Sequence, residues 1–451
     1  MSHFRQQLRI DAPYGPTSLL KIFLPFFAEQ ILSNTVGFVN TVVMSGYSDE
    51  AVGIIGTANQ LVSLITVFYA SIGGGGAIAL CHSVGRKDYE EANSMANCLL
   101  HMSILISLVL GFGLSFFSVP LLRLMNLEGA ALEEASVYFR IVVAPCFLMG
   151  IINSVSAIFR SHNYQHISVI VTFGMNIVNL ILCYLAVYRP TLVPLSGIPG
   201  VAAANVASRL CAAAAMLLLL KFGPVRFKPK FLPVWKDPNV RPILHYSIPG
   251  GVMSFSYSAS QAVTTSILVT LGMTIVSAKI YISNLVQYVY LAGYSLSQAH
   301  GLVTGWYVGA GRQDEAERLN WRNQKLVWLL NGSLSLLIAL FGRIALHLFT
   351  KDASIIELCR PILFIDIFVE LARGTNHIQE HFLRGAGDVT YPMLTSILCE
   401  WLVVIPLTYL LGVVLKLGLG GCWLAFAADE AIRSLVLVLR ERSGKWKLQR
   451  L

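Results

Sequence analysis

The chain has 451 residues, of which 55% are hydrophobic and only 13% are charged. A soluble protein would carry about 25% charged residues, so the composition excludes a soluble globular protein and predicts a polytopic membrane protein. The formal net charge of +9 is spread over the loops between apolar segments, so we do not expect nucleic acid as a partner.

Apolar segments that could cross a bilayer recur along the whole chain. Such a helix needs roughly 17–25 residues. Residues 1–17 are polar and basic and are expected to be a cytoplasmic segment. A cleavable signal peptide is not expected, because the first apolar run is too long for one. Twelve transmembrane helices are predicted, at residues 18–44, 51–81, 92–120, 135–159, 166–188, 198–221, 243–271, 277–308, 325–349, 356–382, 391–415 and 420–439.

The second half of the chain repeats the first at an offset of about 221–226 residues, a long-period internal repeat. Pro25 corresponds to Pro249, Gly85 to Gly311, and Arg160 to Arg384. The sequence therefore predicts an all-α membrane protein built from two six-helix lobes. With an even number of helices in each, the lobes insert the same way up as parallel repeats, and a central cavity between them is expected, as in other two-lobed transporters.

The predicted domain boundaries follow from the loops. The N-lobe is expected at 18–221 and the C-lobe at 242–439. A proline-rich, basic linker at 222–241 joins them, and a basic tail follows at 440–451. Most Lys and Arg residues fall on one side if the N-terminus is cytoplasmic, which is the positive-inside bias. Both termini, the linker and the tail are therefore expected in the cytoplasm, with the basic loops in contact with anionic lipid headgroups.

The first copy contains few polar residues inside its predicted helices. Glu29 is its one candidate for ion coupling, since an ionisable side chain is costly within the membrane. Asn34, Asn40, Asn176 and Asn179 are predicted to contact a substrate. The alternatives are hydrogen bonding between helices for the amides and a solvated position near the membrane surface for Glu29.

The second copy is richer in charge. Asp366, Glu370 and Arg373 lie at i, i+4 and i+7 in the tenth predicted helix, along one helical face. Asp429 and Arg433 lie at i, i+4 in the twelfth. A carboxylate between an apolar wall and an arginine can exchange a proton or bind Na⁺, so these five residues are predicted to couple transport to an ion. The alternative is that the acids and arginines form neutralising pairs that only hold the helices together.

Uncharged polar residues mark the seventh and eighth predicted helices. Tyr257, Gln261, Asn284, Gln287 and Tyr288 are predicted to line a substrate cavity, with ordinary helix packing as the alternative. The tyrosine rings could also hold an organic cation through cation–π attraction.

One motif suggests a different class of protein. His377, Glu380 and His381 read H-x-x-E-H, the signature of a zinc hydrolase in which two histidines bind the metal. The motif lies at the end of the tenth predicted helix, before a turn that the repeat explains, and no third ligand follows in a comparable context. A zinc-dependent membrane hydrolase is therefore kept only as an alternative, and we expect neither an enzyme nor a metal or other cofactor.

The order of these features resembles the multidrug and toxic compound extrusion (MATE) family. The similarity spans residues 18–447 and is carried by the first helix, LPFFAEQILSNTVGFVNTVVMSG, by the turns GRKDYEEA and GRQDEAER, and by FLRGAGDVTYP. The resemblance implies an antiporter that exports organic, often cationic and amphipathic, compounds in exchange for H⁺ or Na⁺ by alternating access. Many members carry Asp where this chain has Asn40, which favours ion coupling through the second copy.

A lipid-linked saccharide flippase of the same superfamily is the alternative. Flippases tend to have more helices and a strongly cationic cavity, whereas few arginines lie within the predicted helices here. The expected partners are a small organic substrate and membrane lipid, and the expected location is a bacterial or archaeal plasma membrane. A monomer suffices, because the expected cavity is intramolecular.

Overall fold

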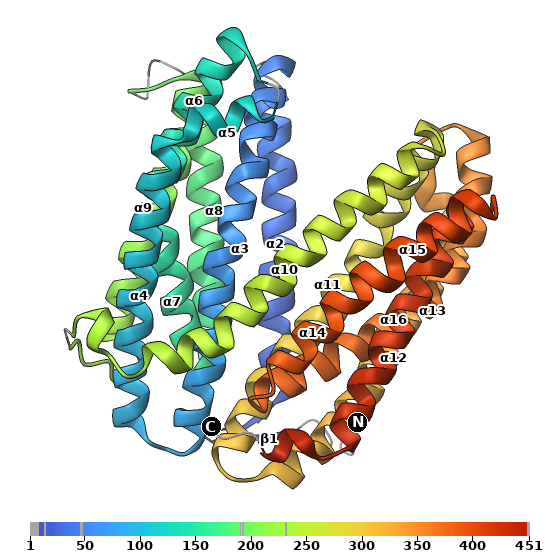
Figure 1. Cartoon of the computed structure of the whole chain (residues 1–451). Helices are drawn as coiled ribbons and strands as arrows, with labels where there is room; N and C mark the ends of the chain where they lie inside the picture. The colour runs from blue at the N-terminus through green and yellow to red at the C-terminus, as the bar shows by residue number, and fades with distance from the viewer. Residues whose placement is uncertain are drawn as a thin grey trace. The chain divides into compact units, whose positions relative to one another are not determined.

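The computed structural model describes residues 9–12, 15–45, 48–125, 127–189, 191, 194–230, 232–347 and 349–448, with the backbone alone at residues 9, 36–42, 45 and 49. The described chain is almost entirely helical (Figure 1). Strands occur within these ranges only as the pair β1 (Arg9–Ala12) and β2 (Gly15–Ser18) before the first helix. The predicted all-α class is confirmed. Its physical basis is that a helix satisfies its own backbone hydrogen bonds in lipid.

Each predicted membrane segment coincides with a helix or a group of consecutive helices. The first half contains α2 (Leu19–Ser45), α3 (Asp49–Gly85), α4 (Tyr89–Phe116), α5 (Ser118–Arg123), α6 (Gly129–Val143), α7 (Phe147–Ser161), α8 (Gln165–Tyr188) and α9 (Gly197–Phe222). The second half contains α10 (Val240–Val269), α11 (Met273–Gly309), α12 (Gln313–Leu346), α13 (Ala353–Gly385), α14 (Thr390–Cys399), η3 (Glu400–Val404), α15 (Ile405–Leu407), η4 (Thr408–Val414) and α16 (Gly418–Arg442). Short helical turns η2 (Val234–Lys236) and η5 (Lys445–Leu448) lie in the linker and the tail.

Several of these helices are suited to a membrane by length and composition. Six in the described part of the chain are long and apolar enough to cross one, and the pair α6–α7 would make a seventh if it counts as one span. Helices α13 and α16 are not among them, since charged residues interrupt their apolar stretches. Large apolar side chains such as Phe112, Phe341 and Ile344 are exposed, as expected for surfaces that face lipid.

Two predicted membrane helices are not simple α-helices. The fourth is divided into α6 and α7, which meet at 41°. Pro145 lies at the break and cannot donate a helical hydrogen bond. The eleventh contains the π-helical turns η3 and η4. Such turns often occur at functional sites, and the first residue of η3 is Glu400.

The chain divides into two compact units. The N-terminal unit comprises Ala28–Gly251, and the C-terminal unit comprises Val252–Leu451 together with Pro16–Phe27 and β1. Helices α2 and α10 therefore each begin in one unit and end in the other. In both helices the boundary between the two units follows shortly after a proline, which is Pro25 in α2 and Pro249 in α10. These boundaries differ from the lobes expected from the loops, since the first part of α10 packs with the N-terminal unit.

Within the N-terminal unit, a glycine lets α10 approach α3 closely. A Cβ added to Gly75 of α3 would lie 2.5 Å from the backbone nitrogen of Ser247 of α10. The hydroxyl of Ser71 also donates a hydrogen bond to the carbonyl of Ser247. Side-chain volume at position 75 would therefore force the two helices apart.

Close contact between α11 and α13 in the C-terminal unit leads to a stability prediction. A Cβ on Gly385 would lie 2.5 Å from the carbonyl oxygen of Gly301. We therefore expect Gly385→Ala to lower the free energy of unfolding by about 1–3 kcal/mol, the usual cost of overpacking. Gly113→Ala in α4 is the matched control, because no atom lies within 4 Å of its added Cβ. Thermal unfolding in detergent measures both variants, and equal melting temperatures would contradict the prediction.

Candidate functional site

A cavity of about 350 Å³ lies within the C-terminal unit. Its lining side chains come from α10, α11, α13, η3 and α16. They include four carboxylates and three cations. The carboxylates are Asp366, Glu400, Asp429 and Glu430, and the cations are Lys279, Arg373 and Arg433. The cavity that the sequence predicted between the two lobes stays a prediction.

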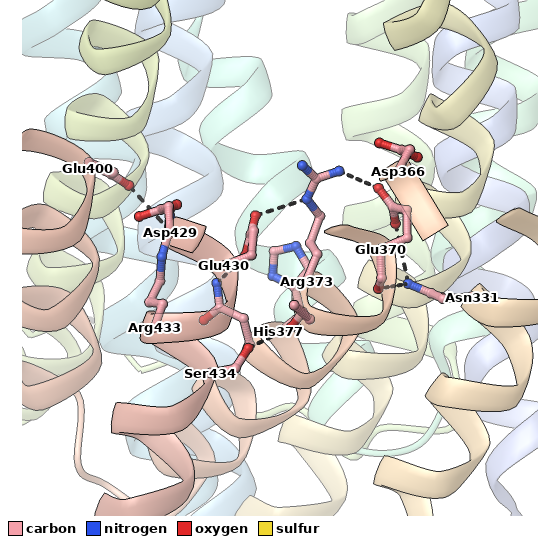
Figure 2. Close-up of polar contacts among 12 residues, drawn as sticks. Asn331, Asp366, Glu370, Arg373, His377, Glu400, Asp429, Glu430, Arg433 and Ser434 are labelled. Carbon is pink, nitrogen blue, oxygen red and sulfur yellow. Dashed lines mark hydrogen bonds and ion pairs between the residues drawn. The ribbon is translucent and has the colours of Figure 1, made fainter. Parts of the chain in front are cut away.

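Arg373 connects α13 to α16. Its Nη1 binds Glu370 on its own helix, and its Nε donates to Glu430 Oε1 on α16 at 2.9 Å (Figure 2). Asn376 Nδ2 donates to the other oxygen of Glu430, also at 2.9 Å. One guanidinium therefore pairs with two buried carboxylates and ties the two helices together.

Glu370, which Arg373 binds, is fully buried. Asn331 of α12 contacts it from the other side, and its Nδ2 lies 3.2 Å from the Glu370 carbonyl and 3.4 Å from the carboxylate. Because Glu370 does not line the cavity itself, it acts on the cavity by fixing the position of Arg373.

A second arginine organises the other end of the cavity. Arg433 binds Asp429 on its own helix, and its Nη1 lies 3.8 Å from Glu400 Oε1. The other oxygen of Glu400 accepts a hydrogen bond from Ser256 of α10. Figure 2 shows the charged side chains following one another from Glu400 to Asp366.

Two carboxylate oxygens in the cavity have no hydrogen-bond partner among the described residues. Trp423 Nε1 donates to Asp366 Oδ1 at 2.9 Å, but Asp366 Oδ2 has no partner, and neither has Asp429 Oδ1. Both residues are at least 96% buried, with exposed fractions of 2% and 4%. A buried acceptor without a partner costs about 1–3 kcal/mol, so these oxygens are suited to receive a proton, a metal cation or a charged ligand.

The cluster has more negative than positive groups. The carboxylates of Asp366, Glu370, Glu400, Asp429 and Glu430 outnumber the guanidiniums of Arg373 and Arg433. Lys279 adds one ammonium group, which donates to Thr265 Oγ1 at 2.9 Å. The excess of carboxylates favours binding of a cation.

A buried amide network holds the helices behind the cavity. Asn320 of α12 contacts His300 Nε2 at 3.0 Å and donates to Gln379 of α13 at 3.0 Å. Gln379 donates to Gln324 at 3.2 Å, and Gln324 donates to Thr375 at 3.1 Å. These side chains fix α11, α12 and α13 against one another, and none of them belongs to the predicted site.

The predicted ion-coupling residues are not all in one place. The structure brings Asp366, Glu370, Arg373, Asp429 and Arg433 together. Glu29 is separate, in the N-terminal unit, where both of its oxygens accept from Arg160 Nη2 at 2.8 and 2.7 Å. Its charge is therefore neutralised by a partner.

Two acids of the cluster were absent from the predicted site. Glu430 contacts Arg373 of α13, and Glu400 approaches Arg433 of α16, so both pairs join different helices. Glu430 follows directly after Asp429 in the sequence. An acidic pair inside an apolar helix, with Arg433 three residues after Glu430, is the local sign that could have identified it.

The predicted substrate contacts of α10 and α11 divide into two groups. Tyr257, Gln261 and Gln287 line the cavity, together with Tyr290. Asn284 and Tyr288 are exposed and do not line it. At 100° per residue they lie about 110° and about 150° from the centre of the stripe formed by Ser283, Val286, Gln287 and Tyr290, which line the cavity.

The predicted amides of the first copy lie in the N-terminal unit. Asn34 is exposed and donates to the carbonyl of Gln30 at 2.9 Å. Asn179 is buried, and Asn176 is partly buried with its Nδ2 unpartnered. The side chain of Asn40 lies outside the described residues.

The H-x-x-E-H motif is engaged in other contacts. Glu380 binds Arg384 at 3.0 Å, and His381 Nδ1 contacts the carbonyl of His377 at 2.9 Å. Both histidine rings pack against Tyr294. In the part of the chain that the structure describes, no group of three His, Cys, Asp or Glu residues could hold a metal ion, so the structure gives the zinc alternative no support.

Comparison with known proteins identifies the fold. The MatE family model matches residues 25–185 and 249–410, one match in each half of the chain. An uncharacterized transporter YisQ of Bacillus subtilis (strain 168) is 29% identical over 433 residues, covering 95% of this chain and 94% of the relative. A probable multidrug resistance protein NorM of Thermotoga maritima is 23% identical, with 97% and 94% coverage.

Solved structures agree with this fold. An outward-facing multidrug resistance MATE family transporter of the MOP superfamily has a TM-score of 0.88 at 19% identity, covering 99% of both chains. A MOP superfamily transporter from Pyrococcus furiosus, described as having a binding pocket of reverse polarity, has a TM-score of 0.86 at 18% identity, with 96% coverage of both. The predicted helical transporter fold is confirmed.

Proposed function

Because the chain belongs to the MatE family, whose model matches most of both halves, we propose that it is a secondary active antiporter. It exports organic, cationic and amphipathic compounds in exchange for H⁺ or Na⁺ by alternating access. The relatives named as probable multidrug resistance proteins support this substrate class. The basic loops support a plasma-membrane orientation with both termini in the cytoplasm.

The observation that carries the proposal is the pair of unpartnered oxygens on Asp366 and Asp429. Both side chains line the cavity, so a coupling ion and a cationic substrate would compete for the same negative charge. When the ion binds, it neutralises the carboxylate and weakens the attraction for the substrate. Mutual exclusion of this kind is what an exchange of ion for substrate requires.

The walls of the cavity suit an amphipathic cation. Tyr257, Tyr290 and Phe426 add aromatic surface beside the carboxylates. Aromatic faces attract organic cations, by up to about 2 kcal/mol when the contact is dry. The cavity volume of about 350 Å³ also falls within the range of roughly 300–1,000 Å³ usual for small-molecule sites.

The excess of carboxylates does not favour the flippase alternative. A carrier of lipid-linked saccharides, whose linking groups are phosphates, needs a cationic cavity. In this cavity the arginines are already bound to acids. We therefore retain the antiporter as the single proposal.

Transport into inside-out vesicles tests the proposal. A proton gradient and a sodium gradient are imposed separately, and we expect ethidium to accumulate under one of them. The gradient that drives the accumulation identifies the coupling ion. Vesicles from cells without the protein give the background. Absence of transport under both gradients, for several chemically different organic cations, would overturn the antiporter.

A further inference from the structure

A second cavity, of about 380 Å³, lies at the start of α12 in the C-terminal unit. It is remote in sequence from the acidic cluster, and the transport mechanism makes no use of it. Its lining side chains come from β1, α11 and α12, and they are Asp11, Tyr307, Glu315, Arg318, Leu319 and Arg322.

The cavity is lined by two arginines, one of which has buried donors without an acceptor. Nε and Nη2 of Arg322 are buried and make no hydrogen bond. Arg318 is exposed, and its charge lies near the carboxylates of Asp314 and Glu315. The two residues are four positions apart on α12, so their side chains lie on the same face of the helix. Buried guanidinium donors without acceptors are costly, so Arg322, with the exposed Arg318 one turn away, presents a site for an oxyanion.

The two acids at the cavity do not supply the missing acceptors, because Arg312 already binds them. Arg312 donates to both oxygens of Glu315 at 2.7 and 2.6 Å and to Asp11 Oδ2 at 3.1 Å. Arg312, Arg318 and Arg322 carry one positive charge more than Asp11 and Glu315 carry negative, and the nearby Asp314 is bound by Lys447 at 2.8 Å.

Tyr307 contributes a further polar group. Its hydroxyl oxygen accepts a hydrogen bond from the backbone N–H of Asp11 at 3.2 Å, which leaves its own proton available for donation. The guanidinium of Arg312 lies over the Tyr307 ring, 4.6 Å from its centroid. The ring is therefore held in place at the wall of the cavity.

The position along α12 identifies the kind of oxyanion. Arg318 and Arg322 directly precede residues 325–349, the predicted membrane span, on the side that the charge bias predicts to be cytoplasmic. Side chains at that level meet lipid headgroups, and basic pockets between helices there bind anionic lipids. Arginine is suited to phosphate because its planar donors can bind two oxygens at once.

We propose that the cavity formed by Arg318, Arg322 and Tyr307 binds the phosphate of an anionic phospholipid headgroup. The phosphate oxygens accept from the unpartnered nitrogens of Arg322 and from Arg318, and the Tyr307 hydroxyl donates to a third oxygen. The acyl chains extend along the apolar surface of α12, where Leu329 and Leu336 are exposed. This inference does not depend on the transported substrate or on the coupling ion.

Native mass spectrometry of the purified, delipidated full chain tests the site. The probe is dioctanoyl-phosphatidylglycerol, with dioctanoyl-phosphatidylcholine and inorganic phosphate as separate comparisons. We expect Arg322→Gln to weaken binding of the first phosphatidylglycerol by roughly tenfold, because hydrogen bonds to charged groups are lost. Lys325→Gln is the matched control. It removes the same charge from the same helix at an exposed position, and we expect a change within about twofold, since solvent and salt screen exposed charges.

The comparisons distinguish the proposal from simpler explanations. Tighter binding of phosphatidylglycerol than of phosphatidylcholine and phosphate, lost in Arg322→Gln alone, supports an anionic lipid site. Equal weakening in Arg322→Gln and Lys325→Gln would overturn it in favour of general surface attraction. Inorganic phosphate that binds as tightly as the lipid would overturn the lipid assignment. If Arg322→Gln does not fold, Arg322→Lys is measured in its place under the same criteria, because lysine keeps the charge but lacks the planar donors that bind two phosphate oxygens at once.

Discussion

Export driven by the ion gradient is expected to fall by roughly 10- to 100-fold when Asp366 is replaced by Asn. An interaction with a charged group contributes about 1.5–3 kcal/mol, which corresponds to about that factor in binding. Asn is nearly the same shape and can still accept the hydrogen bond from Trp423 Nε1. It lacks the negative charge and the unpartnered oxygen. The measurement is ethidium uptake into inside-out vesicles under each gradient.

Asp352→Asn provides the control for this result. The substitution is the same and lies in the same helix, but Asp352 is the exposed N-cap of α13, where it accepts from the backbone N–H of Ser354. Asn is an equally good N-cap, so we expect transport close to that of the wild type. Gradient-driven export by Asp366→Asn at the wild-type rate would show that coupling does not use this carboxylate, and Asp429→Asn would then be measured.

Replacing Arg373 with Gln is expected to lower the free energy of unfolding by about 3–5 kcal/mol, the usual cost of removing one partner from a buried ion pair. The loss leaves Glu370 and Glu430 without the guanidinium that balances both of them. Glu370 is fully buried and Glu430 is 7% exposed, so water does little to solvate either carboxylate. Thermal unfolding in detergent measures the effect. The same variant also tests whether Arg373 has a role in transport besides holding the helices together. Vesicle transport is measured for this purpose at a temperature at which the variant is still folded.

Arg312→Gln is the matched control for Arg373→Gln. Arg312 also binds two carboxylates, Glu315 and Asp11, but its side chain is 35% exposed. Exposed ion pairs contribute at most about 1 kcal/mol, so we expect a small change in stability. In the double variant Arg373→Gln, Glu370→Gln, one unbalanced charge is removed, and part of the lost stability should return. Equal effects of Arg373→Gln and Arg312→Gln would contradict the buried-pair interpretation.

The sequence by itself determined the class of protein and the positions of its helices. Apolar runs and the internal repeat depend only on the local order of residues, and helices in lipid satisfy their own backbone hydrogen bonds. The stripe of Asp366, Glu370 and Arg373 also followed from helical spacing alone. For the same reason, the pairs Arg373–Glu370 and Arg433–Asp429 could be predicted, since each lies within one turn of one helix.

The tertiary structure alone decided which helices supply the remaining partners. Glu430 meets Arg373 from another helix, Glu400 approaches Arg433 from a π-helical turn, and Trp423 reaches Asp366. The rotation of α11 likewise turned Tyr288 away from the cavity while Gln287 lines it. Contacts between helices depend on how the helices are rotated and packed against one another. Spacing along a single helix does not contain that information, and the unpartnered oxygens of Asp366 and Asp429 became visible only once every neighbouring donor was in place.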